Sequence, residues 1–285
     1  MVLAIDIGNS SISCGVFDAN RWESDNTPIC SFKIASQNLS ADEYTILFLQ
    51  FLQLHAIRIS DSFYAKYPAY RSWLSNSTET GILDACVISS VVPSLTETIS
   101  HTAALICGKT PLLINQGIRT GFEIKVKNPE QLGADIVANI AAALRISQPP
   151  FVVLDVGTAT TITFVNEKRE LTGTVILPGV VVSMEALSHS AALLSDVPLQ
   201  KPSEILGKNT SESVRSGVIM GHAYSIDGFV RNIREQYCGG EKLGLIATGG
   251  LAESILPSCR NKFSYIQNLT LIGAVNLYLH HTQRK

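Results

Sequence analysis

The sequence has few charged residues, a small net charge and no long apolar run, and each absence excludes a class of protein. Charged residues make up 16% of the 285 positions, and the formal net charge is −2. A nucleic-acid-binding protein is expected to present a strongly basic face. No apolar run reaches the ~18 residues of a membrane span, and the N-terminus lacks the basic region of a signal peptide. We therefore expect a cytoplasmic protein that binds neither nucleic acid nor a membrane.

Other absences narrow the chemistry. The six cysteines are scattered without a C-x-x-C pair, which predicts reduced, structural thiols and no zinc site. The sequence contains no G-x-x-x-x-G-K-[ST] motif and no G-x-G-x-x-G after a predicted strand, so P-loop and dinucleotide folds have no support. The serine, histidine and aspartate residues form no recognisable catalytic triad.

The composition, 46% hydrophobic, is that of a compact globular protein. One stretch in the middle of the chain organises the rest. The apolar run Phe151–Leu154 predicts a buried strand, and Asp155, Gly157 and a row of threonines follow it. Such a strand–turn–strand suits the binding of phosphate oxygens, with the Asp155 carboxylate beside a cation. The alternative is a hairpin with one buried, satisfied aspartate.

A second copy of this pattern lies at the N-terminus, where Met1–Ile5 precedes Asp6-Ile-Gly-Asn-Ser10 and a strand over Ile12–Phe17. A repeat at half the chain length favours two similar domains. We expect an α/β fold with mixed sheets and flanking helices, divided at the proline pair after Ser147 into residues 1–147 and 148–285. The predicted terminal helix Leu271–His281 could pack back on the first domain.

A third candidate carboxylate is Asp135, which follows Gly133 and stands at the start of an alanine-rich helix predicted over Val137–Ile146. The helix dipole favours an acid there, so a plain helix-start aspartate is the alternative.

Capping boxes predict two further helix starts, at Ser40–Glu43 and Ser94–Glu97. The aromatic-containing segment 58–82 is predicted to be irregular surface, with room for a short helix.

Together these motifs resemble a known family, the type III pantothenate kinases. The resemblance rests on their order along nearly the whole chain: Asp6-Ile-Gly-Asn-Ser10, Ser90-Val-Val-Pro93, Asn128-Pro-Glu-Gln-Leu-Gly-Ala-Asp135, Asp155-Val-Gly-Thr-Ala-Thr-Thr161, Gly173 with Ile176-Leu-Pro-Gly179, Gly207-Lys-Asn-Thr210 and Thr248-Gly-Gly250. It implies two actin/hexokinase/Hsp70-like (ribonuclease H-like) domains. It also implies ATP-dependent phosphorylation of the primary hydroxyl of pantothenate, the first step toward coenzyme A.

The resemblance further implies roles for single residues. ATP would be bound by eight residues of the two hairpins and the Thr-Gly-Gly turn: Asp6, Gly8, Asn9, Ser10, Gly157, Thr158, Gly249 and Gly250. Asp6 would also bind Mg²⁺. Asp155 would bind a monovalent cation (K⁺ or NH₄⁺). Asp135 would be the general base, and Gly133, Ala134, Asp135, Ile136 and Thr210 would bind pantothenate. Thr210 would act in the neighbouring subunit of a homodimer with shared active sites.

One position departs from the family pattern. The loop of the family reads Gly-x-Asp-Arg, and its arginine helps to hold the substrate carboxylate, whereas this chain has Ile136. A charge-assisted hydrogen bond of that kind contributes roughly 1.5–3 kcal/mol. Two alternatives therefore stand beside the pantothenate kinase: a kinase with a different acceptor, and a nucleotide-binding relative with a non-catalytic, regulatory role.

Overall fold

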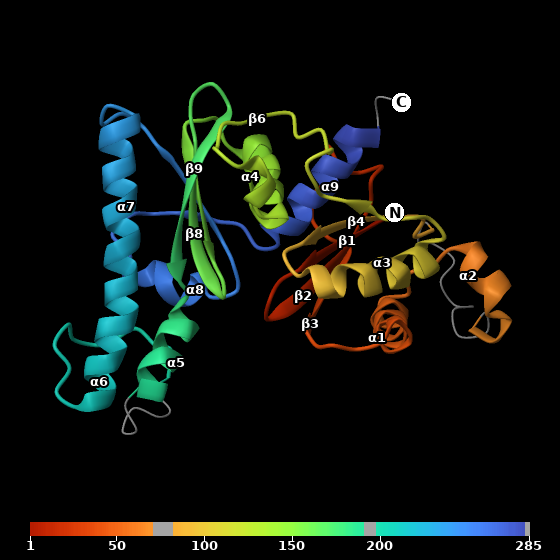
Figure 1. The fold of residues 1–285 in the computed structure, drawn as a ribbon, viewed down its shortest axis with the longest axis horizontal. Helices are drawn as coiled ribbons and strands as arrows, with labels where there is room; N and C mark the ends of the chain where they lie inside the picture. The colour runs from red at the N-terminus through yellow and green to blue at the C-terminus, as the bar shows by residue number, and fades with distance from the viewer. Residues whose placement is uncertain (71–81, 191–197, 283–285) are drawn as a thin grey trace. The chain divides into compact units, whose positions relative to one another are not determined.

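The computed structural model describes residues 1–70, 82–190 and 198–282, which form two compact units (Figure 1). Unit 1 comprises Met1–Gly121, Glu130–Ala142 and Thr270–Lys285, and unit 2 comprises Phe122–Pro129 and Ala143–Leu269. Each unit is therefore built from separate stretches of the chain. Near the middle of the chain, unit 1 gives way to unit 2 between Ala142 and Ala143. The domain boundary after Ser147 stays a prediction.

Unit 1 contains a mixed sheet of strand order β3-β2-β1-β4-β5. Strand β1 pairs antiparallel with β2 and parallel with β4. The strands are β1 (Val2–Ile7), β2 (Ser11–Phe17), β3 (Cys30–Ala35), β4 (Ala85–Ser90) and β5 (Leu112–Leu113). The helices are α1 (Ala41–Leu54), α2 (Asp61–Lys66), α3 (Pro93–Cys107), α4 (Ala134–Ile146), whose last turn belongs to unit 2, and α9 (Leu269–Thr282), whose first residue does.

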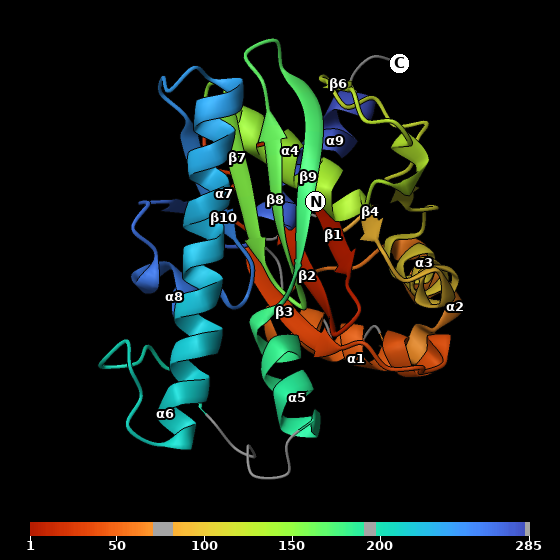
Figure 2. The same ribbon diagram turned by 60° about the vertical axis from the view of Figure 1, so that its left-hand side comes forward.

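Unit 2 contains a mixed sheet of strand order β11-β10-β7-β8-β9-β6. Its strands are β6 (Glu123–Ile124), β7 (Phe151–Val156), β8 (Ala159–Val165), β9 (Glu170–Pro178), β10 (Gly244–Thr248) and β11 (Ser264–Tyr265). Its helices are α5 (Val180–Ser190), α6 (Thr210–Arg215), α7 (Gly221–Tyr237) and α8 (Ala252–Ile255). Figures 1 and 2 both show α7 running along the sheet of unit 2.

The two sheets repeat one topology. Strand β7 pairs antiparallel with β8 and parallel with β10, as β1 does with β2 and β4, and β9 and β11 take the places of β3 and β5. Asp6 and Asp155 occupy the same position, the fifth residue of a six-residue first strand. The predicted repeat and the α/β fold of actin/hexokinase type, with two mixed sheets and flanking helices, are thereby confirmed. Strand β6 is an addition at the edge of the second sheet.

Every second residue of the central strands faces the same side of its sheet, and on one side these residues pack against helices. In unit 1 Leu3, Ile5 and Ile7 of β1 join a core with Tyr44 and Phe48 of α1. In unit 2 the equivalent core joins β7 and β8 to residues of α7, among them Ala223, Ile226 and Val230. The apolar spacing of the sequence thus places each Asp-x-Gly turn at the end of a buried strand.

Of the two predicted capping boxes, one is confirmed and one is wrong. The Ser40 side chain accepts from Glu43 N, and the Glu43 carboxylate accepts from Ser40 N, at the start of α1. Helix α3 instead begins at Pro93 with Val92 as its N-cap and no side-chain cap bond. Proline is well suited to a first helical position, because it lacks the N–H that would go unpaired there.

The prediction for segment 58–82 is partly confirmed in the described residues, because the short helix for which it left room is α2. The expected surface position is wrong for Phe63 and Tyr64, which are buried. The Phe63 ring lies 5.0 Å from that of Tyr67 and 5.8 Å from that of Tyr70, measured between centroids. These aromatic residues therefore extend the core of unit 1, while residues 71–81 lie outside the described part. Across the described residues, no helix has the length and apolar character needed to cross a membrane.

Candidate functional site

The first Asp-x-Gly hairpin lies at the end of β1 in unit 1. Asp6 is half-buried, and its Oδ1 accepts a hydrogen bond of 2.8 Å from the hydroxyl of Ser89, which is fully buried in the neighbouring β4. Asn9 and Ser10 lie exposed at the tip of the loop. The structure therefore brings together a fixed carboxylate and an exposed polar loop, as the sequence predicts for a phosphate and cation site.

A residue that the sequence analysis missed holds this loop. Ser36 directly follows β3, and its N–H donates to Ser10 O (3.2 Å) while its hydroxyl donates to Gly8 O (2.6 Å). One residue therefore bonds to both ends of the Gly8–Ser10 loop. This restrains the loop that presents Asn9.

The second hairpin, in unit 2, has the same construction with a loop one residue shorter. Asp155 is half-buried and Thr158 is exposed at the tip. After β9, Gly179 N donates to Thr158 O (3.1 Å), in the place where Ser36 N bonds to Ser10 O. A side chain on Gly179 would collide with the backbone of Gly157 and Thr158. The Pro178-Gly179 turn of the sequence therefore lies directly against the phosphate-loop candidate.

The Thr-Gly-Gly turn after β10 lies against the same hairpin. Leu251 N donates to Val156 O (3.0 Å), and in unit 1 Val91 N donates to the equivalent Ile7 O (3.0 Å). Gly249 has a φ of +99°, and a Cβ there would collide with Val156 and the Asp155 carboxylate. Only glycine fits such a position without strain. The structure thus brings together Asp155, Gly157, Thr158 and Gly249, with Gly250 exposed beside them.

Asp135 lies in the first turn of α4, as predicted. Its Oδ1 accepts from Ile136 N (2.8 Å), and a side chain on Gly133 would collide with this carboxylate. Burial raises the pKa of the Asp135 carboxyl above its ordinary value, against the opposing effect of the backbone N–H donors of Ile136 and Asp135 itself. A desolvated carboxylate with a raised pKa is a stronger proton acceptor, so the geometry suits a general base.

The residues on either side of Asp135 are packed rather than open. Ala134 is 9% exposed and Ile136 is 7% exposed. A Cβ on Gly133 would lie 3.4 Å from Val91 Cγ1, so the start of α4 adjoins the turn after β4. The Asp135 turn and the Asp6 hairpin are consequently linked through Val91, whose N–H bonds to Ile7 O.

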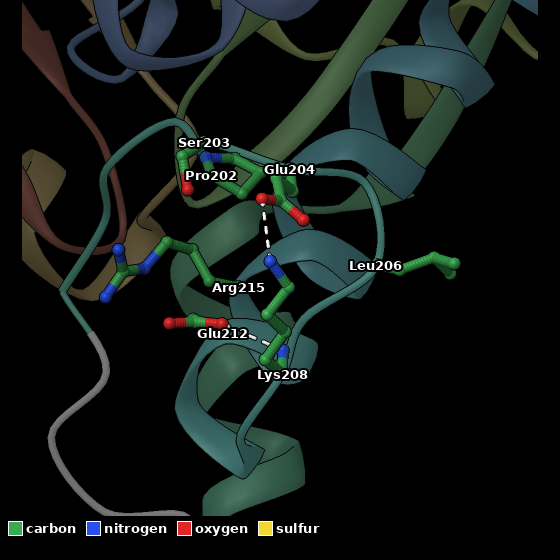
Figure 3. Close-up of a pocket in the computed structure, with 7 residues that line it drawn as sticks. All are labelled: Pro202, Ser203, Glu204, Leu206, Lys208, Glu212 and Arg215. Carbon is green, nitrogen blue, oxygen red and sulfur yellow. Dashed lines mark hydrogen bonds and ion pairs between the residues drawn. The ribbon is translucent and has the colours of Figure 1, made fainter.

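Thr210 lies in unit 2, exposed at the first position of α6. The loop before it and α6 itself form a small hollow of ≈ 160 Å³ (Figure 3), lined by Pro202, Ser203, Glu204, Leu206, Lys208, Glu212 and Arg215. Lys208 Nζ pairs with Glu204 Oε1 at 2.9 Å, and Lys208 N donates to Glu212 Oε2 at 2.8 Å. Lys208 is therefore already engaged within its own loop.

The carboxylates of the candidate site suit a cation whose other coordination positions are filled by phosphate oxygens. Among the described residues no group of three or more His, Cys, Asp or Glu side chains comes together as a metal cage. Mg²⁺ in kinases usually takes one or two carboxylates, with phosphates and waters filling the other positions. Single half-buried carboxylates beside candidate phosphate loops, such as Asp6 and Asp155, are compatible with that requirement.

Comparison with solved structures supports the fold. A protein from Campylobacter jejuni described as a Baf family transcriptional activator superposes with a TM-score of 0.56 at 17% identity, with 99% of both chains covered. The ethanolamine utilization protein EutJ from Carboxydothermus hydrogenoformans superposes with a TM-score of 0.50 at 15% identity, over 97% of this chain and 88% of that one. At these identities the likeness concerns the fold alone.

Comparison of sequences identifies the family. The model of the type III pantothenate kinase family matches residues 2–232. A type III pantothenate kinase from Shouchella clausii (strain KSM-K16) is 36% identical, with 98% of each chain covered. One from Geotalea uraniireducens (strain Rf4) is 33% identical, also with 98% of each chain covered. The chain belongs to the type III pantothenate kinase family.

Proposed function

We propose that this protein transfers the γ-phosphoryl group of ATP to the primary hydroxyl of pantothenate. The observation that carries the proposal is the repeated, clamped Asp-x-Gly hairpin in a chain that belongs to this kinase family. The matched relatives are named type III pantothenate kinases, and the similarity covers 98% of each chain. This favours the kinase over a nucleotide-binding relative with an altered acceptor or a regulatory role.

In the proposed reaction, the pantothenate hydroxyl oxygen forms a bond to the γ-phosphorus while the bond from that phosphorus to the bridging oxygen breaks and ADP leaves. Asp135 accepts the hydroxyl proton, since its carboxylate is desolvated and held in place at the start of α4. Phosphoryl transfer needs little more from a protein than positioning, charge neutralisation and this one base.

The two loops are assigned to the nucleotide. Asn9 and Ser10 bind phosphate oxygens in unit 1, Thr158 does so in unit 2, and Gly249 and Gly250 present bare backbone to the nucleoside. Asp6 holds Mg²⁺, which neutralises phosphate charge when bound, and Asp155 holds K⁺ or NH₄⁺. The support for these roles is the exposure of the loop tips and the fixed, half-buried carboxylates beside them.

The test of this function is an assay that couples ADP release to a spectroscopic signal, with Mg²⁺ and K⁺ present. We expect ADP release to depend on pantothenate, and to fall when Na⁺ replaces K⁺ and NH₄⁺. ADP release that is indifferent to pantothenate would refute the assigned acceptor. A rate that is equal in Na⁺ and K⁺ would remove the monovalent cation from Asp155.

In the first turn of α4 this chain has Ile136 where the family pattern has an arginine. We expect Ile136→Arg to lower the KM for pantothenate by about tenfold, since a charge-assisted hydrogen bond to its carboxylate contributes roughly 1.5–3 kcal/mol. The KM for ATP should hardly change. Ile136 is buried, so the variant should also be less stable.

Ile136→Met is the control for that variant, because it alters the packing of the same site without adding a charge. The two KM values for pantothenate, measured at saturating ATP, separate the charge from the packing. An arginine variant with the KM of the methionine variant would place the substrate carboxylate elsewhere.

We also propose that the protein is a homodimer with shared active sites, with Thr210 acting in the partner's pocket. A Cβ on Gly217 or Gly221 would meet no atom within 4 Å, so a partner helix could approach the backbone closely there. Figures 1 and 2 show α5 and α6 at the same end of unit 2. Exposed apolar residues lie on this unit: Ile176, Val182, Leu187, Ile205, Leu206, Tyr224 and Tyr237.

Light scattering at micromolar concentration should give about twice the 30.8 kDa mass of the chain. Leu206→Ser should shift the mass toward the monomer, because Leu206 is 81% exposed beside the Thr210 helix. Leu54→Ser is the matched control, since Leu54 is similarly exposed (78%) but ends α1 of unit 1. A parental chain with the mass of a monomer would remove the shared-site proposal.

A further inference from the structure

A buried polar pair crosses the core of unit 2. Thr160 Oγ1 and His222 Nε2 lie 2.9 Å apart, with Thr160 fully buried and His222 8% exposed. Because side chains alternate along a strand, Thr160 shares the face of β8 that carries Ile162 and Phe164. That face packs against the apolar residues of α7, so the hydrogen bond lies in otherwise apolar surroundings.

The repeat shows that the core does not require polarity at this position. Strands β2 and β8 have equal length, and the equivalent of Thr160 in unit 1 is Ile12, which is fully buried. Ile12 pairs with Ile7 in the same register in which Thr160 pairs with Val156. One unit thus fills this place with an aliphatic side chain, while the other uses a threonine that must find a partner.

Thr160 lies where the nucleotide loop is anchored. It pairs with Val156 on one side and with Leu177 on the other. Val156 O accepts the bond from Leu251 N, and the loop residue Thr158 accepts the bond from Gly179 N. Any shift of Thr160 therefore moves the strand from which the Gly157–Thr158 loop emerges.

The helix that carries His222 has an irregularity at this point. A π-helical segment, Ser216–Met220, links α6 to α7 and ends two residues before His222. Its backbone hydrogen bonds span five residues instead of the four of an α-helix, and such segments are common at functional sites. The helical register that presents His222 to Thr160 is consequently set within this segment.

We propose that His222 is a positioning residue of the nucleotide site, which holds the Gly157–Thr158 loop in place through its hydrogen bond to Thr160. The inference rests on the proposed function, in which that loop binds the phosphates of ATP. Burial lowers the pKa of His222, which favours the neutral ring. A neutral imidazole can bond to the Thr160 hydroxyl as acceptor or as donor, depending on its tautomer.

The test replaces both partners by apolar residues, Thr160→Val together with His222→Leu. Removing both ends of a buried hydrogen bond is nearly neutral for stability, so the melting temperature should change little. Binding of a fluorescent ATP analogue with Mg²⁺, titrated without pantothenate, should weaken by roughly three- to tenfold. The KM for pantothenate at saturating ATP should stay at its parental value.

Thr163→Val is the matched control. Thr163 is buried in the same strand, and its hydroxyl bonds to that of Thr174 at 3.1 Å, on the opposite face and further from the loop. Its ATP affinity should equal that of the parental chain. If the double variant melts as the parental chain does and binds the analogue equally well, the positioning role is refuted.

Should the double variant not fold, single substitutions at Thr160 decide. Thr160→Ser keeps the hydroxyl and should bind the analogue at least threefold more tightly than Thr160→Val does, whereas equal affinities would overturn the proposal. The titration needs no acceptor. A failure of pantothenate to stimulate ADP release would therefore refute the proposed function and leave the effect of His222 measurable.

Discussion

Replacing Asp135 by asparagine is expected to lower turnover by ~10²-fold or more, the usual magnitude for loss of a general base. Binding of ATP should remain, since the loop residues assigned to it lie on other segments. The melting temperature at neutral pH should stay the same or rise, because the fold disfavours the ionised carboxylate: burial raises its pKa. Steady-state kinetics and thermal melts of one preparation test both effects.

The sign of the pH dependence follows from the direction of that shift. A carboxyl whose pKa is raised in the folded state contributes stability at low pH, and this contribution is lost as the pH rises through the folded pKa. The free energy of unfolding of Asp135→Asn should therefore exceed that of the parental chain by an amount that grows from acid toward neutral pH. Activity of the parental chain should fall on acidification at a pH above the ordinary aspartate range, as the base becomes protonated.

Asp42→Asn is the control for this experiment. Asp42 also lies in the first turn of a helix of unit 1, but it is exposed. Its turnover should match that of the parental chain. Parental turnover in Asp135→Asn itself would show that another group takes the proton.

The substitution Gly273→Ala, which adds one methyl group, is expected to lower the stability of the fold strongly. Helices α4 and α9 cross so closely at this glycine that a Cβ would collide with the backbone carbonyl of Ala138. Hydrogen bonds from Thr270 to the Asn139 side chain (2.8 Å) and from Asn276 to Ala141 O (2.9 Å) hold the helices together on either side. Overpacking of this kind destabilises by about 1–3 kcal/mol. Gly273→Ala should thus lower the melting temperature by roughly 3–10 °C.

The same variant should lose activity, because Ala138 lies one turn after Asp135 on α4. A displacement of a catalytic group by about 1 Å is enough to cost on the order of 10²-fold in rate. Gly228→Ala provides the comparison, since a Cβ on this glycine of α7 meets no atom within 4 Å. Alanine is the better helix former there, by about 0.5–1 kcal/mol. Equal melting temperatures in the two variants would contradict the tight crossing.

The parts of the site that could be predicted from the sequence are those that depend on local pattern. Alternating or continuous apolar residues followed by Asp-x-Gly predict a buried strand and a turn, which gave the positions of Asp6 and Asp155 and the repeat. The alanine-rich run after Gly133 predicted that Asp135 lies at a helix start. These features need no knowledge of residues distant in the chain.

The parts that could not be predicted depend on backbone groups or on distant partners. Ser36 and Gly179 clamp the loops by donating hydrogen bonds to backbone carbonyls, and neither a backbone N–H nor a serine hydroxyl indicates in the sequence which distant carbonyl it will bind. Ser89 bonds to Asp6 from a strand far along the chain. No pattern near His222 in the sequence indicates that its partner is Thr160. The Ser94 prediction failed because Pro93 already suits the first position of the helix.

The division of the chain has a consequence for its synthesis. Unit 1 comprises the first 121 residues, the short stretch Glu130–Ala142, and Thr270–Lys285, which holds all of α9 but its first residue. Most of unit 2 lies between the last two of these stretches. A nascent chain emerges N-terminus first, so unit 2 can be complete while unit 1 still lacks α9. Until that helix leaves the ribosome, α4 has no α9 to pack against, and the proposed base has no fixed support. Every residue assigned to the reaction is thus translated before the chain can hold Asp135 in place.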